Sequence, residues 1–100
     1  MKEWTKNDWQ ESMVNEPVAA FYLYTPMCGT CAVASRMLAV VEELLPDVPI
    51  GKGNVNYLQD LAIHYEVESV PCLLIARDGK YDRKLYAFQS VPHLYEILKK

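Results

Sequence analysis

Two cysteines separated by two residues, Cys28 and Cys31, are the residues of this sequence best suited to chemistry. Two intervening residues bring the sulfurs close enough to bond within one helical turn. An apolar run precedes the pair, and an apolar pattern of helical spacing follows it. The start of a helix favours negative charge, so a thiolate on Cys28 is stabilised there. The spacing therefore predicts thiol–disulfide exchange, with Cys28 attacking and the more buried Cys31 resolving.

A third cysteine, Cys72, leaves other interpretations of the pair open. The pair can be inert buried thiols, or it can bind a metal together with Cys72. A zinc site requires four ligands, and the chain has no second Cys-x-x-Cys and no well-spaced histidine pair, so we expect no metal. Strand alternation predicts that Cys72 is a small buried hydrophobe, with a third redox thiol as the alternative.

The elements on either side of the pair are expected to hold it in place. Residues 18–25 are apolar and aromatic without polar alternation, which is typical of a strand covered on both faces. The helix after Cys28 continues to about Leu45. Val33, Val40 and Leu44 make its apolar face broad, so we expect the helix to be substantially buried.

The remaining pattern predicts an α/β chain with a mixed sheet. A capping box at Thr5 and Asp8 predicts a helix over residues 6–15, and the Asp78-Gly79 step predicts a hairpin turn. The other expected elements are a weaker strand over 48–55, a helix over 57–65, strands over 71–76 and 81–88, and a final helix capped by Ser90.

The order strand, Cys-x-x-Cys and helix, with a later Val70-Pro71, resembles the thioredoxin family. This resemblance covers nearly the whole chain. It implies one domain over residues 1–100 with the thioredoxin fold, a mixed four-stranded sheet with helices on both faces. A short extra N-terminal strand near Trp4 is left open. The family also has a cis-proline beside its cysteine pair, which matches Pro71 here. Such a bond leaves the backbone of Val70 free to pair with an extended peptide.

Several positions depart from the family pattern. Met27 replaces the tryptophan that usually precedes the first cysteine, and Thr30 replaces the proline between the cysteines. Tyr22 stands where other members of the family have a buried aspartate that is thought to move a proton to the resolving thiol. The aspartate's partner lysine matches Lys52, for which a solvated strand lysine is the alternative interpretation. The Thr30 hydroxyl and amide can better satisfy the Cys28 thiolate, which predicts a potential less reducing than that of thioredoxin.

The resemblance thus implies two sets of residues around the catalytic cysteines. The expected supporting residues of the active site are Gly29, Thr30, Lys52 and Pro71. The expected substrate contacts are Met27, Val70 and Pro71.

Composition narrows the classes of protein to which the chain can belong. It has 100 residues, of which 51% are hydrophobic and 23% charged, so it is expected to fold around one core. A net charge of −3 provides no footprint for nucleic acid. No apolar run reaches about 18 residues, so we expect no membrane span. Residues 1–7 are polar and lack the apolar region of a secretory signal, which favours the cytoplasm.

We interpret the sequence as a cytoplasmic, monomeric thiol–disulfide oxidoreductase that reduces or exchanges protein disulfides. It requires no bound organic cofactor, because the disulfide itself carries the electrons. Its expected partners are protein disulfide substrates and an electron donor, either a disulfide reductase or a low-molecular-weight thiol. The alternative is an interaction module of the same fold, in which the cysteines switch partner binding without general turnover.

Overall fold

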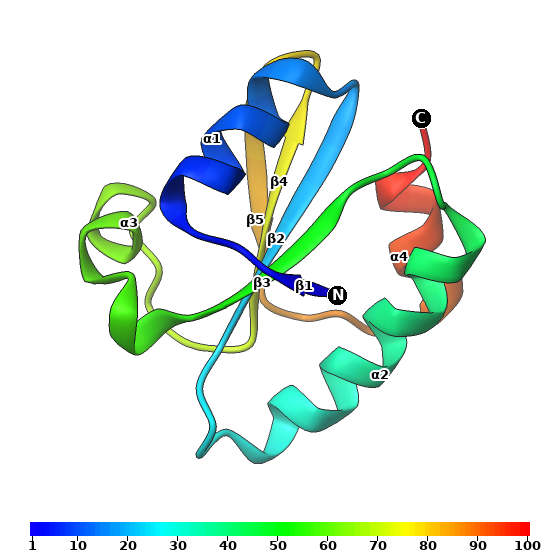
Figure 1. The fold of residues 1–100 in the computed structure, drawn as a ribbon. Helices are drawn as coiled ribbons and strands as arrows, with labels where there is room; N and C mark the ends of the chain where they lie inside the picture. The colour runs from blue at the N-terminus through cyan, green and yellow to red at the C-terminus, as the bar shows by residue number, and fades with distance from the viewer.

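The computed structural model describes all residues 1–100, and its elements follow the predicted order (Figure 1). In chain order they are β1 (Lys2–Glu3), α1 (Lys6–Asn15), β2 (Val18–Tyr24), α2 (Gly29–Leu44), β3 (Ile50–Asn54), the 3₁₀ helix η1 (Val55–Tyr57), α3 (Gln59–His64), β4 (Cys72–Arg77), β5 (Lys80–Leu85) and α4 (Val91–Leu98).

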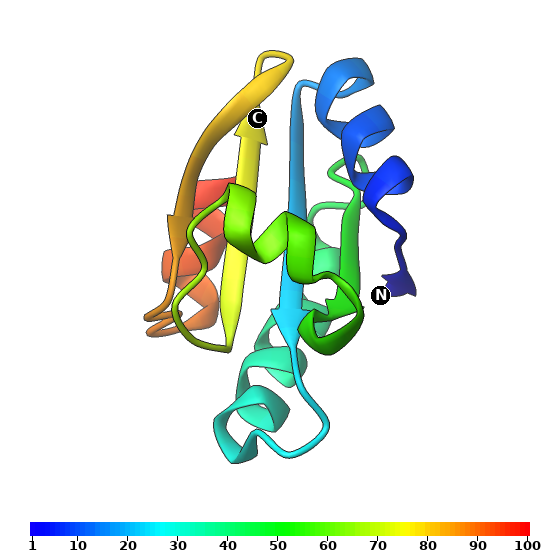
Figure 2. The same ribbon diagram turned by 90° about the vertical axis from the view of Figure 1, so that its left-hand side faces the viewer.

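The strands form one mixed sheet of five strands in the order β1-β3-β2-β4-β5. β1, β3 and β2 are parallel, whereas β4 and β5 are antiparallel to their neighbours. α1 and α3 lie on one face of the sheet, and α2 and α4 lie on the other (Figures 1 and 2). The predicted mixed sheet between two helical layers is therefore confirmed, and the short N-terminal strand brings the strand count to five.

The central strand β2 divides the core into two layers. Six of its seven residues are buried, as expected for a strand covered on both faces. Because side chains alternate along a strand, Val18, Ala20 and Tyr22 face α2 and α4, while Ala19, Phe21 and Leu23 face α1 and α3. The loop to the cysteine pair leaves this rigid strand at Tyr24.

The predicted capping box fixes the start of α1. The Asp8 amide donates to Thr5 Oγ1 at 3.1 Å, and the Thr5 amide donates to Asp8 Oδ2 at 2.9 Å. One turn later Trp9 is fully buried, with its ring centroid 5.7 Å from that of Phe21 and its Nε1 donating to Tyr65 Oη at 3.1 Å. Trp9 thus joins α1 to both the sheet and the end of α3.

The two glycines of β3 have packing roles that their low strand propensity does not indicate. A Cβ at Gly51 would overlap the ring of Trp4, and one at Gly53 would lie 2.6 Å from Leu58 Cδ1. Gly51 also pairs with Lys2 in β1. Glycine is thus required here so that Trp4 can lie across β3, beside the added N-terminal strand.

Three predicted features of the helices and strands are wrong in detail. The helix expected over 57–65 begins only at Gln59, because Leu58 has a non-helical backbone (φ −130°, ψ 40°) between η1 and α3. The side chain of Tyr57 is consequently 86% exposed. The strand expected over 81–88 ends at Leu85, after which the chain turns inward to bury Phe88.

The third correction concerns α2. The helix was expected to be substantially buried across a broad apolar face, but Val33, Val40 and Leu44 on that face are 50%, 46% and 54% exposed. The helix instead buries a narrower stripe, which consists of Cys31, Ala34, Leu38 and Val41. A helix lying on a sheet covers only one side of itself, and no other element of this chain reaches the opposite side. None of the helices is both long and apolar enough to cross a membrane.

Candidate active site

Cys28 and Cys31 form a disulfide at the junction between β2 and α2, with their Cα atoms 5.3 Å apart. Cys28 is the residue that caps the start of α2, so its sulfur lies at the positive end of the helix dipole. Its side chain is partly exposed, whereas Cys31 is only 5% exposed and packs in the core below α2. One sulfur can therefore meet a partner while the other is shielded.

Two of the predicted supporting residues lie between the cysteines. Gly29 is exposed, and a Cβ there would meet nothing within 4 Å, so the space in front of Cys28 is open. The hydroxyl oxygen of Thr30 lies 3.4 Å from Cys28 Sγ, within hydrogen-bond reach for sulfur. In the reduced pair this hydroxyl can donate to the Cys28 thiolate, as the sequence predicted.

We expect Thr30→Val to make the pair more reducing. The substitution keeps the side-chain shape but removes the donor, so the Cys28 thiolate loses about 1 kcal/mol of stabilisation and the dithiol is less favoured. For a two-electron couple this corresponds to roughly 20 mV. A redox titration against glutathione measures the shift, and Thr30→Ser is the control that retains the hydroxyl. Equal potentials for Thr30→Val and wild type would remove this role from Thr30.

The predicted substrate-contact residues surround the exposed side of Cys28 unevenly. The Val70 carbonyl oxygen lies 3.8 Å from Cys28 Sγ, and the Val70–Pro71 peptide bond is cis. Val70 packs at the edge of both core layers. Met27, directly before Cys28, is 94% exposed and belongs to neither core cluster of the chain. Val70 and Pro71 thus form a wall beside the sulfur, and Met27 projects freely.

A cavity of about 230 Å³ lies behind the disulfide, on the side of β2 and β3. Its lining residues are Tyr22, Tyr24, Thr25, Pro26, Cys28, Cys31, Ala32, Ser35 and Lys52. Lys52 reaches this cavity from β3 with its Nζ 6.0 Å from the centroid of the Tyr24 ring, and it forms no ion pair. Lys52 therefore lines the cavity behind the disulfide, and its support of the active site stays a prediction.

Tyr22 is the functional residue whose role the sequence did not reveal. Its hydroxyl donates to the Cys31 carbonyl oxygen at 2.7 Å, which ties the first turn of α2 to the central strand. Burial, and secondarily the neighbouring Tyr24, raises the pKa of Tyr22 to about 12, so the residue stays neutral. No carboxylate lines the cavity, and proton exchange at Cys31 here has no carboxylate to use. The sequence signal that could have revealed this role is strand alternation, which places Tyr22 on the side of β2 that faces α2.

Cys72 does not belong to this site. It is fully buried in the layer between the sheet and α1 and α3, whereas Cys31 lies in the opposite layer. Burial raises the pKa of the Cys72 thiol to about 11, with a smaller opposing effect of Lys84. The thiol therefore remains protonated and unreactive at neutral pH. The three cysteines do not converge, and no group of three metal-ligating side chains occurs in the chain.

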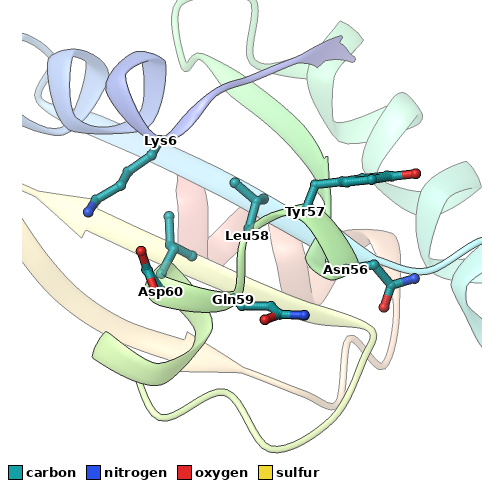
Figure 3. Close-up of a pocket in the computed structure, with 7 residues that line it drawn as sticks. Lys6, Asn56, Tyr57, Leu58, Gln59 and Asp60 are labelled. Carbon is teal, nitrogen blue, oxygen red and sulfur yellow. The ribbon is translucent and has the colours of Figure 1, made fainter.

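A second, open cleft of about 480 Å³ lies away from the cysteines, between the start of α1 and the segment that joins β3 to α3. Figure 3 shows Lys6 extending from α1 above Asp60, while Tyr57 points away from both. None of the predicted site residues lines this cleft. This cleft is therefore separate from the cysteine pair at the β2–α2 junction.

The geometry can now be compared with known proteins. The sequence model of the family described as thioredoxin matches residues 1–100. The chain belongs to the thioredoxin family. A thioredoxin-like protein of Bacillus subtilis (strain 168), YusE, is 51% identical over 86 residues, which are 86% of this chain and 81% of that protein. Thioredoxin of Staphylococcus aureus is 34% identical over 95 residues, covering 90% of this chain and 88% of the relative.

Solved structures agree on the fold. A mutant thioredoxin from Halobacterium salinarum NRC-1 superposes with a TM-score of 0.86 at 21% identity, covering 98% of this chain and 86% of its own. Trxlp from Edwardsiella tarda EIB202 has a TM-score of 0.84 at 16% identity, covering 99% of this chain and 98% of that protein. The thioredoxin fold predicted from the sequence is thus confirmed. Family and cysteine pair together establish a thiol–disulfide redox function.

Proposed function

We propose that this thioredoxin-family protein reduces or exchanges the disulfides of other proteins through Cys28 and Cys31. The observation that supports this most is the asymmetry of the pair. Cys28 is partly exposed at the start of α2 beside the Val70 carbonyl, and Cys31 is shielded one turn further on. An asymmetric dithiol separates attack on a substrate from release of the product.

The reaction proceeds in two exchanges. The Cys28 thiolate attacks one sulfur of the substrate disulfide, forms a mixed disulfide and expels the other substrate sulfur, which takes up a proton. Cys31, as the thiolate, then attacks Cys28 Sγ and expels the second substrate thiol. Two electrons have moved to the substrate, and Cys28–Cys31 is oxidised. The Tyr22 hydroxyl keeps the backbone of Cys31 in place during the second exchange.

The wall beside Cys28 suits an extended substrate segment. The Val70 carbonyl can accept a hydrogen bond from a peptide that lies across it, with Pro71 and Met27 as apolar contacts. We assign the return of electrons to a disulfide reductase or a low-molecular-weight thiol, acting in a reducing cytoplasm on a monomeric protein. Gly29 leaves both types of donor access to the disulfide.

Thiol-driven reduction of insulin disulfides tests this function. We expect wild type to accelerate the reaction and Cys28→Ser to lose the acceleration. Cys72→Ala is the matched control and is expected to retain it, because Cys72 lies in the opposite layer. Wild type without turnover, but with a Cys28–Cys31 bond that still forms and breaks reversibly, would overturn general reduction in favour of a redox-switched interaction module.

A further inference from the structure

Lys84 in β5 and Tyr86, which directly follows β5, hold the segment that leads from α3 to Val70. Lys84 Nζ donates to the carbonyl oxygens of Tyr65 at 2.9 Å and Glu66 at 2.8 Å. Tyr86 Oη accepts from the Glu68 amide at 3.0 Å and lies 3.4 Å from the Glu66 carbonyl oxygen, to which it can donate. Figure 2 shows this segment passing from α3 to the start of β4. The two side chains thus make four polar contacts with the backbone of three residues, Tyr65, Glu66 and Glu68.

The turn that they hold has an unfavourable backbone conformation. Glu66 has a φ of +53°, in the left-handed region that favours glycine. The Glu66 amide donates to Ile63 O at 3.1 Å, and the Val67 amide donates to Ala62 O at 2.8 Å. These two hydrogen bonds are the pattern of a Schellman motif at the C-terminus of a helix. A glutamate at this position weakens the turn, and the Lys84 ammonium offsets the cost by binding the carbonyls of Tyr65 and Glu66, directly after the C-terminus of α3.

The held turn is directly connected to the substrate wall. Only Ser69 separates Glu68 from Val70, whose carbonyl lies 3.8 Å from Cys28 Sγ. No local sequence pattern assigns a role to Lys84, and the Tyr86 hydroxyl bonds to this loop. If the segment loosened, Val70 would lose its fixed position while Cys28 and Cys31 stayed anchored to α2.

We propose that Lys84 and Tyr86 are positioning residues for protein substrates, which they serve by fixing the segment 65–68 and hence the Val70 backbone beside Cys28. This inference rests on the proposed reduction of protein disulfides. It separates two properties of the site. Binding of an extended peptide requires a fixed Val70, whereas attack on a small disulfide without a peptide backbone requires only an accessible Cys28.

The test compares two substrates, insulin and the small disulfide 5,5′-dithiobis(2-nitrobenzoic acid), in steady-state kinetics. The variants are Lys84→Met, which keeps the aliphatic stem, Tyr86→Phe, and the double variant. We expect the double variant to raise KM for insulin about tenfold, with kcat and the rate on the small disulfide nearly unchanged. Arg83→Met and Tyr81→Phe, both in β5, are the matched controls, because neither side chain bonds to the segment 65–68.

Hydrogen exchange provides the structural readout. We expect the Val67 amide, which donates to Ala62 O, to exchange faster in the double variant, while amides of β2 keep their protection. An unchanged KM for insulin in a folded double variant overturns the positioning role, as does an equal loss on both substrates. If wild type reduces the small disulfide but not insulin, the proposed function is overturned, and the positioning role falls with it. That outcome is distinct from a failure of the positioning role alone, in which wild type reduces both substrates.

Discussion

The Cys31→Ser variant is expected to stop after the first exchange and to remain covalently attached to its substrate through Cys28. The serine hydroxyl cannot attack a disulfide at neutral pH, whereas the partly exposed Cys28 remains free to form the mixed disulfide. Insulin turnover is therefore expected to fall by at least about a hundredfold. Non-reducing electrophoresis and intact mass measure the trapped adduct, which a strong reductant releases.

Cys28→Ser provides the matched control, because it leaves the buried Cys31 as the remaining thiol of the pair. We expect no adduct, since Cys31 is only 5% exposed and lies within the core below α2. The opposite pattern, with adducts on Cys31 in Cys28→Ser and none in Cys31→Ser, would reverse the roles of attacking and resolving thiol. Adducts in both variants would show that burial of Cys31 does not protect it.

Trp9→Ala is expected to destabilise the fold by about 3–5 kcal/mol, a large part of the roughly 5–15 kcal/mol that holds a typical domain together. Trp9 is fully buried, stacks on Phe21 and donates to Tyr65 Oη, so its removal leaves a cavity and an unsatisfied hydroxyl. Urea unfolding followed by circular dichroism measures the free energy of unfolding.

Val14→Ala on the same helix is the control, because Val14 is 65% exposed. Its expected effect is within about 0.5 kcal/mol of zero. A cost below about 1 kcal/mol for Trp9→Ala would mean that α1 is not anchored through this ring. If Trp9→Ala also abolishes turnover at urea concentrations where the variant is still folded, then α1 supports the active site through Tyr65, at the end of α3.

The local patterns of the sequence determined most of the fold. Apolar residues without alternation identified β2 as a covered strand, and the Thr5–Asp8 box located α1, since both signals depend on neighbouring residues alone. Cys-x-x-Cys between a strand and a helix also predicted the disulfide, because three residues of sequence separation leave little choice of partner. The resemblance to a family supplied Val70 and Pro71, which no local pattern indicates.

Only the tertiary structure decided how the site is supported. Tyr22 bonds to the Cys31 carbonyl from another element, and Lys84 and Tyr86 bond to a segment 18 to 20 positions away, so no local pattern contains these contacts. The sequence also could not predict that Val33, Val40 and Leu44 of α2 are exposed, because helical spacing shows that a face is apolar but not whether another element covers it. Periodicity and spacing report local geometry, whereas burial and long-range hydrogen bonds depend on the assembled chain.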